Sequence, residues 1–105
     1  MNPQPYEIHF AIVRLNESGD QRPCVIIDPP QDNTVAVLLI SGQLDSFNSA
    51  EHFLISANHP DFAATGLSKS CYVLSRVVDV PTSQLTKMKG ALTGDLLKEF
   101  KRWFG

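Results

Sequence analysis

Apolar residues gather in five separate stretches along the first 80 positions, and each stretch has the composition of a β-strand. Val, Ile and aromatic residues dominate them, and these residue types favour strands. The longest apolar run, TVAVLLIS at 34–41, predicts the central strand of a sheet. The run CVIID at 24–28 has four consecutive apolar residues, which predicts a short strand buried on both faces. The five predicted strands are residues 8–14, 24–28, 34–41, 52–57 and 72–80.

Turn-forming residues separate these strands. Pro23 lacks a backbone N–H, so it predicts that the second strand begins there, after a polar loop at 15–22. The segment DPPQDN at 28–33 ends that strand, and loops are predicted at 41–49 and 58–70. Pro81 ends the last strand, and residues 82–92 predict a helical turn and a short extended piece around Gly90.

From residue 93 the period of the apolar positions changes to that of a helix. Apolar residues recur at four-residue spacing, and charged residues occupy the other face. This pattern predicts an amphipathic helix of about three turns, with Thr93 as its N-cap. The apolar positions are Leu92, Leu96, Phe100 and Phe104, with Leu97 and Trp103 beside them. The whole pattern predicts one domain over residues 1–105, mainly β with a C-terminal α-helix, forming a small curled β-barrel of about five strands.

Composition places the chain among globular proteins. The chain has 105 residues, of which 43% are hydrophobic and 19% charged, so it is long enough to bury a core without disulfides. No apolar run approaches the roughly 20 residues of a membrane span, and the first ten residues lack a signal-peptide pattern. We therefore expect a cytoplasmic protein without membrane contact. Cys24 and Cys71 lie in apolar, strand-like context and are expected to be reduced core residues. A disulfide between neighbouring strands is the alternative.

The charge is distributed unevenly along the chain. The net charge is −2, with most acidic residues in the first two thirds and seven of the nine basic residues after position 68. This asymmetry is compatible with a local basic face for an anionic partner. Ordinary solvation, or pairing between oppositely charged faces of two subunits, accounts for it equally well.

The segment NESGDQRPCVIID at 16–28 carries the strongest candidate chemistry. Glu17 and Arg22 form a candidate catalytic or anion-binding pair at a sheet edge, and the alternative is a solvated turn in which Arg22 pairs with Asp20 or Asp28. Ser41 ends the central strand, where its hydroxyl serves a ligand or starts a turn with the next residue.

Histidine and aromatic residues supply further candidates. The three histidines lack metal-ligand spacing, so no metal is expected. His59 lies in a long loop from which it can reach a substrate, and Phe47, in a polar loop, is the best candidate for stacking on a base. Phe53 is expected in the core. Arg76 either points into the same groove or, as we favour, outward.

Two blocks of the sequence resemble the PemK/MazF family of toxin endoribonucleases. The first is the order of strand, polar loop, Arg-Pro, apolar strand, turn and a long apolar strand that ends in a hydroxyl residue. The second is TGLSKSCYVLSRVVDVPTSQLTKMKGALTGDLLKEF at 65–100, with its T-G-L segment and its L-x-x-x-x-G-x-L passage before the final helix. The resemblance implies an SH3-like barrel, usually dimeric, that cleaves single-stranded RNA without metal or cofactor and is inhibited by an antitoxin peptide.

The resemblance also implies site residues. The family's loop carboxylate falls on Glu17, its arginine on Arg22 and its strand-end hydroxyl on Ser41, which would be catalytic; Phe47, His59 and Arg76 are candidates for substrate binding. The chain departs from the family in carrying serine in place of threonine at 41, Gly42 in place of a small polar residue, and PQPYEIHF in place of the opening Arg-Gly-Asp pattern.

Two functions follow from these observations. The first is a metal-independent endoribonuclease, in which a carboxylate accepts the proton of the RNA 2′-OH, Arg22 stabilises the phosphorane charge and a hydroxyl donates a further hydrogen bond. Its partners are single-stranded RNA and an antitoxin, with no DNA as substrate, and Trp103 and Phe104 predict a homodimer. The second is a non-catalytic SH3-like barrel that binds a peptide or protein. The acidic first two thirds and the missing opening pattern favour the second function. The placement of Glu17, Arg22 and Ser41 and the basic last third favour the first, which we adopt with the second as its alternative.

Overall fold

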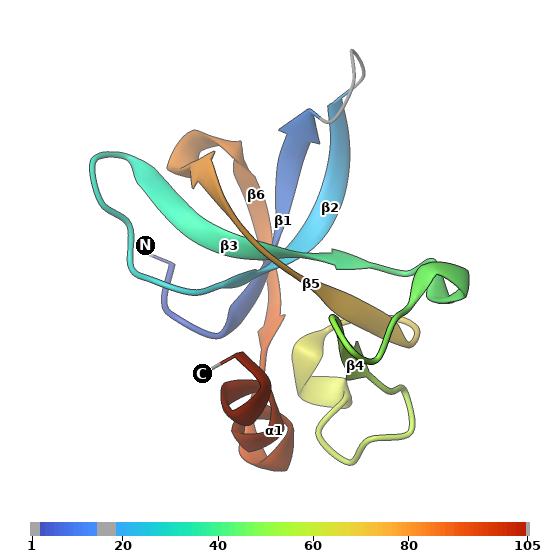
Figure 1. Cartoon of the computed structure of the whole chain (residues 1–105). Coiled ribbons are helices and arrows are strands. Elements are labelled where there is room, and N and C mark those ends of the chain that lie inside the picture. The colour runs from blue at the N-terminus through green and yellow to red at the C-terminus, as the bar shows by residue number, and fades with distance from the viewer. Residues whose placement is uncertain (1–2, 15–18, 105) are drawn as a thin grey trace.

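A computed structural model describes residues 3–14 and 19–104 of the chain. The described residues form a single antiparallel sheet of six strands in the order β4-β5-β3-β2-β1-β6, followed by one α-helix. Figure 1 shows that the sheet curls strongly and that the helix α1 covers one end of it. The elements are β1 (Glu7–Arg14), β2 (Gly19–Ile26), β3 (Thr34–Ser41), β4 (Phe53–Ile55), β5 (Cys71–Pro81), β6 (Leu85–Ala91) and α1 (Gly94–Phe104). The predicted fold class, mainly β and curled with a C-terminal helix, is confirmed.

The sixth strand is the main addition to the predicted fold. The helical turn expected after residue 81 is the 3-10 turn Thr82–Gln84, but the following piece is a full strand, β6, paired with β1 from Glu7↔Ala91 to Ala11↔Leu85. The sequence of β6, LTKMKGA, contains two lysines, a threonine and a glycine and has no continuous apolar run. Because β6 is an edge strand with exposed positions, it lacks the apolar pattern by which the other strands are recognised.

The predicted start of the second strand at Pro23 is wrong. β2 begins at Gly19, and Pro23 lies within it, opposite Phe10 of β1. Pairing of β2 with its other neighbour, β3, runs from Cys24 to Ile26. Pro23 is therefore the last residue of the part of β2 that pairs with β1 alone, where a missing N–H on the other side is tolerated. Arg22 consequently lies in the middle of β2, opposite Ala11, and not at the mouth of a strand.

The central strands are buried on both faces, as their continuous apolar runs predict. Cys24, Val25 and Ile26 have no exposed surface. Val25 packs into the core beneath α1, whereas Cys24 and Ile26 pack into a second apolar cluster on the opposite face. Both thiols are buried and free. Burial raises the pKa of Cys24 to about 12 and also raises the pKa of Cys71.

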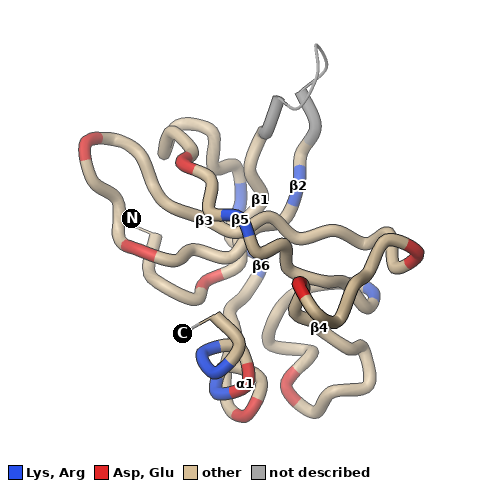
Figure 2. The backbone as a smooth tube through the Cα atoms, viewed as in Figure 1, with Lys and Arg blue, Asp and Glu red and all other residues tan. Residues whose placement is uncertain are grey.

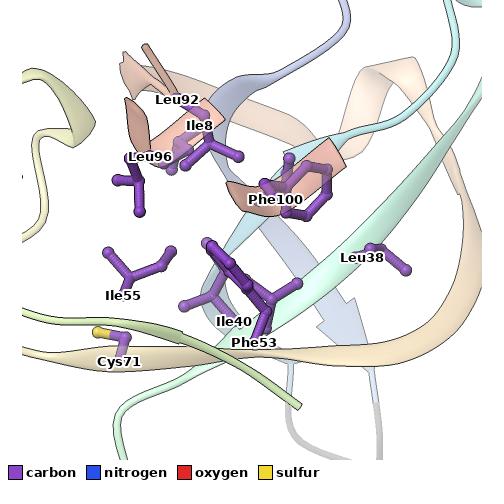
Figure 3. Close-up of a cluster of buried hydrophobic side chains, with 11 residues drawn as sticks. Ile8, Leu38, Ile40, Phe53, Ile55, Cys71, Leu92, Leu96 and Phe100 are labelled. Carbon is purple, nitrogen blue, oxygen red and sulfur yellow. The ribbon is translucent and has the colours of Figure 1, made fainter. Parts of the chain in front are cut away.

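The apolar stripe of α1 closes the core at the end of the sheet, as predicted. Leu96 and Phe100 are fully buried, and Figure 3 shows them among aliphatic and aromatic side chains of the strands. Phe53 lies edge-on to Phe100 with 5.5 Å between ring centroids, in the core position predicted for it. Trp103 is half-buried against Phe53, whereas Phe104 is 38% exposed. No helix in the described part of the chain has the length and apolar character needed to span a membrane.

The first turn of α1 is held by the long connection between β4 and β5. The carbonyl of Thr93 accepts a hydrogen bond from the N–H of Leu97, but Gly94 between Thr93 and the helical turn has φ +57°. The side-chain capping predicted for Thr93 is provided by Asp61 instead. The carboxylate of Asp61 accepts hydrogen bonds from the N–H groups of Asp95 (2.9 Å) and Leu96 (3.3 Å). A residue 34 and 35 positions upstream of these two donors thus satisfies free N–H groups of the helix start.

Candidate active site

A pocket of about 340 Å³ opens between β2, the end of β3, the segment before β5, and β6. Two of the predicted catalytic residues, Arg22 and Ser41, line it together. Apolar side chains, among them Phe10 and Leu67, form part of its wall. The sheet brings Arg22 and Ser41 together because β2 and β3 are adjacent strands.

Arg22 reaches the pocket with a donor that the protein does not use. The residue is half-buried on β2, and its Nε is buried without a hydrogen-bond partner among the described residues. Of the two carboxylates proposed as surface partners, Asp28 forms no ion pair with it, and the side chain of Asp20 lies outside the described ones. A buried donor without an acceptor costs roughly 1–3 kcal/mol.

Ser41 has the turn-forming role that its sequence position allows. Its Oγ accepts a hydrogen bond of 3.2 Å from the N–H of Gln43, which forms the local turn. This bond uses a lone pair of the oxygen. The hydroxyl hydrogen therefore remains available to donate to a group in the pocket.

Two lysines that the sequence interpretation did not single out, Lys69 and Lys89, also line the pocket. A side chain at position 42 would come within 2.7 Å of the Lys69 Cε. The side chain of Lys69 therefore lies across Gly42, and the departure from the family at that position leaves it room. The available signal was the basic character of the last third of the chain, to which both lysines belong.

The T-G-L segment folds into a turn that forms one wall of the pocket. Thr65 is fully buried; its hydroxyl donates to the carbonyl of Phe62 (2.6 Å) and accepts from the N–H of Leu67 (3.1 Å). Gly66 has φ +73°, and a Cβ on it would collide with the carbonyl oxygen of Lys89. Glycine at this position thus allows the turn to touch the backbone of β6.

The pocket is basic. Arg22, Lys69 and Lys89 come from three different segments, and no acidic side chain is among the described residues that line the pocket. Figure 2 shows acidic residues mainly on loops and turns around the periphery of the molecule. Cys71 also lines the pocket, but burial raises its thiol pKa, an effect that the charge of Lys69 only partly offsets. The thiol is therefore protonated near neutral pH and is a poor nucleophile.

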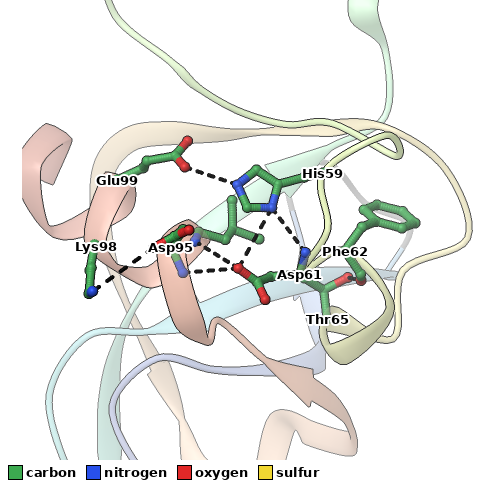
Figure 4. A network of polar contacts seen from close by, with 8 residues as sticks. His59, Asp61, Phe62, Thr65, Asp95, Lys98 and Glu99 are labelled. Atoms are coloured by element: carbon green, nitrogen blue, oxygen red, sulfur yellow. Dashed lines mark hydrogen bonds and ion pairs between the residues drawn. The ribbon is translucent and has the colours of Figure 1, made fainter.

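His59 is occupied elsewhere. As Figure 4 shows, the imidazole lies between the connection 58–70 and α1. Its Nδ1 accepts the N–H of Asp61 (3.0 Å), and its Nε2 lies 2.9 Å from Oε2 of Glu99. Both ring nitrogens are therefore engaged, Nδ1 within the connection and Nε2 with the helix. His59 is not among the described residues that line the pocket.

The remaining predicted residues lie away from the pocket or outside the described part of the chain. Phe47 is half-buried against Tyr72, with 5.7 Å between ring centroids, and Arg76 is exposed on β5, in the outward orientation that we favoured. Neither is among the described residues of the pocket wall. Glu17 falls within residues 15–18, which the structure does not describe. The described residues contain no group of three or more His, Cys, Asp or Glu side chains suited to a metal ion.

Comparisons with known proteins agree with this architecture. The fold is similar to the Mycobacterium tuberculosis toxin MazF-mt6 (TM-score 0.67, 18% identity, 94% of this chain and 92% of that chain covered). It is also similar to an endoribonuclease in complex with its cognate antitoxin from a mycobacterial species (TM-score 0.65, 10% identity, 96% and 87% covered). No curated protein sequence matches the chain. A family model described as "PemK-like, MazF-like toxin of type II toxin-antitoxin system" matches residues 6–104. Since this match spans nearly the whole chain, the protein belongs to the PemK/MazF family of toxins, which are endoribonucleases.

Proposed function

We propose that this toxin cleaves single-stranded RNA without a metal ion, by attack of an RNA 2′-OH on the adjacent phosphorus, in the pocket that holds Arg22 and Ser41. The observation that carries the proposal is that Arg22, whose buried Nε has no hydrogen-bond partner among the described residues, lines a pocket with two further cations. A guanidinium binds two phosphate oxygens at once. Its charge is therefore suited to the phosphorane-like transition state.

The reaction assigns a role to each residue. Glu17 accepts the proton of the 2′-OH, whose oxygen then bonds to phosphorus. Arg22 stabilises the extra negative charge on the phosphorane oxygens, and the Ser41 hydroxyl donates a hydrogen bond to one of them. The bond from phosphorus to the 5′-oxygen breaks, and that oxygen takes a proton from water. The products are a 2′,3′-cyclic phosphate and a 5′-hydroxyl, and DNA is no substrate because it lacks the 2′-OH.

We further propose that the partner of the protein is an antitoxin polypeptide and that the protein acts in the cytoplasm. A structurally similar endoribonuclease is solved in complex with its cognate antitoxin. The two buried free thiols fit a reducing compartment. A basic pocket is also open to acidic side chains of a peptide, which would compete with RNA for the same cations.

The test is cleavage of a fluorophore-labelled single-stranded RNA by the purified protein in excess EDTA and reductant. We expect cleavage to persist, to leave a cyclic phosphate on one product, and to stop when the cleaved nucleotide carries 2′-deoxyribose. Loss of activity in EDTA that magnesium or zinc restores would overturn the mechanism. A wild-type protein that cleaves no RNA but binds a peptide in the pocket would instead support the non-catalytic barrel.

A further inference from the structure

Lys89, which lines the pocket, lies at an irregularity in the pairing of β1 and β6. The register between β1 and β6 shifts between Ile8 and His9: Ile8 pairs with Gly90, whereas His9 pairs with Met88. Lys89 is therefore the extra residue of β6, opposite neither of them. Such bulges change the direction of a side chain and are frequent beside active sites.

Two contacts fix Lys89 in this place. Its Nζ lies over the ring of Phe10, 5.1 Å from the centroid. This interaction positions the ammonium group while leaving its N–H donors able to bind oxygen atoms. The close approach of Gly66 to the Lys89 carbonyl holds the backbone. Phe10, Gly66 and Lys89 all line the pocket.

The charge of Lys89 has no carboxylate partner in the described part of the chain. A phosphodiester carries one negative charge before cleavage, and the pocket holds three cations, Arg22, Lys69 and Lys89, which is more positive charge than one phosphate requires. Lys89 is then available for a different phosphate.

Lys87, two positions earlier on β6, faces another hollow of the surface together with His9 and Asp32. The same strand thus carries one lysine at the pocket and one away from it.

We propose that Lys89 forms a second phosphate subsite, which binds a phosphate next to the one that is cleaved in single-stranded RNA. The proposal rests on the proposed function, because it assigns the same pocket to RNA. It makes Lys89 a substrate-positioning residue that Phe10 holds in place. The enzyme accordingly requires a phosphate that flanks the cleaved one.

The first test measures binding without cleavage. The full chain is titrated with a labelled, fully 2′-fluoro single-stranded oligonucleotide, which lacks the attacking hydroxyl, and fluorescence anisotropy is followed between 50 mM and 1 M salt. One phosphate contact on a single strand contributes a slope of about 0.7 in log K against log[salt]. We expect Lys89→Met to reduce the slope by about this amount. When the salt is lowered from 1 M to 50 mM, the affinity of the wild type should therefore rise about eightfold more than that of Lys89→Met. Lys87→Met should keep the wild-type slope, and Lys89→Arg should retain most of it.

The second test locates the phosphate. Single neutral methylphosphonates are scanned along the same oligonucleotide. At one flanking position the substitution should weaken binding to the wild type and to Lys87→Met, but leave Lys89→Met unaffected. Equal slopes for Lys89→Met and the wild type, or equal losses for both lysine variants, would overturn the subsite. Unchanged melting by circular dichroism shows that each variant is folded.

These outcomes separate the subsite from the proposed function. If the wild type binds the oligonucleotide with the expected Lys89 dependence but never cleaves RNA, the proposed function fails, and Lys89 is a phosphate-binding residue of a non-catalytic RNA-binding barrel. If Arg22→Ala abolishes cleavage while Lys89→Met keeps the wild-type slope, the proposed function stands and the subsite fails.

Discussion

Cys24 makes the stability of the protein depend on alkaline pH. Burial raises the pKa of its thiol from 9.0 to about 12, against a smaller opposing effect of a hydrogen bond with the backbone of His9. Well below pH 9 the thiol is protonated in both the folded and the unfolded chain. The free energy of unfolding therefore does not change with pH there on account of this group. Between pH 9 and 12 the unfolded chain releases the proton while the folded chain retains it, and the free energy of unfolding falls.

We therefore expect the thiol of Cys24 to lower the free energy of unfolding by about 2 kcal/mol between pH 8 and pH 10.5. Urea denaturation at several pH values measures this change. Cys24→Ala, which removes the titrating group, should lose correspondingly less stability over the same range, whatever its stability at pH 7. Parallel pH profiles for the two proteins would show that the thiol does not contribute.

The residues of the pocket divide into those that local sequence reveals and those that it does not. Arg22 and Ser41 stand at defined positions in two neighbouring strands, so short motifs place them together. Lys89 enters the pocket through a bulge and through contact with Gly66, which is 23 positions away in the chain. Neither the bulge nor that contact leaves a periodic pattern in the sequence. His59, placed in a long loop by the sequence, is fixed by Glu99 in the last helix, a pairing that only the fold creates.

Among the elements, α1 depends on a side chain from outside its own segment. Asp61 accepts two hydrogen bonds from its first turn, and a carboxylate there also interacts favourably with the helix dipole. Asp61→Ala should reduce stability by about 1 kcal/mol, or about 4–8 °C in melting temperature. Asp45→Ala, at an exposed position of the 3-10 turn Leu44–Ser46, is the matched control. Equal melting of both variants and the wild type would exclude a capping role.

The strands show why the apolar pattern predicted most of the sheet. β3 has the bounds of the predicted strand because its run Thr34–Ser41 is apolar and buried on both faces. For β6 the sequence predicts only a short extended piece, because this edge strand has no continuous apolar run and is held by its pairing with β1. The predicted start of the second strand at Pro23 is wrong for a related reason, because strand pairing decides it as well. Proline is tolerated inside a strand where its missing N–H faces no bonded neighbour, and the sequence does not show which side of β2 is paired.

For the molecule as a whole, we predict a homodimer. Phe104 is 38% exposed, although its ring stacks on Phe100 with 5.9 Å between centroids. An exposed aromatic ring on the margin of the core is a common feature of subunit interfaces. Sedimentation at tens of micromolar protein should give the mass of two chains. Phe104→Glu should shift the equilibrium towards one chain, and a wild-type protein that sediments as a monomer would contradict the prediction.

The most direct test of the proposed active site compares Arg22→Ala with Arg76→Ala, which removes an exposed arginine of β5 outside the described pocket wall. We expect Arg22→Ala to lower kcat/KM for single-stranded RNA about 10²–10³-fold, as for removal of one transition-state donor. Arg22→Lys should fail as well because a point charge cannot bind two oxygens at once. Arg76→Ala should cleave like the wild type, and all three variants should melt within a few degrees of it. Cleavage at the wild-type rate by folded Arg22→Ala would contradict the assignment of this pocket as the active site.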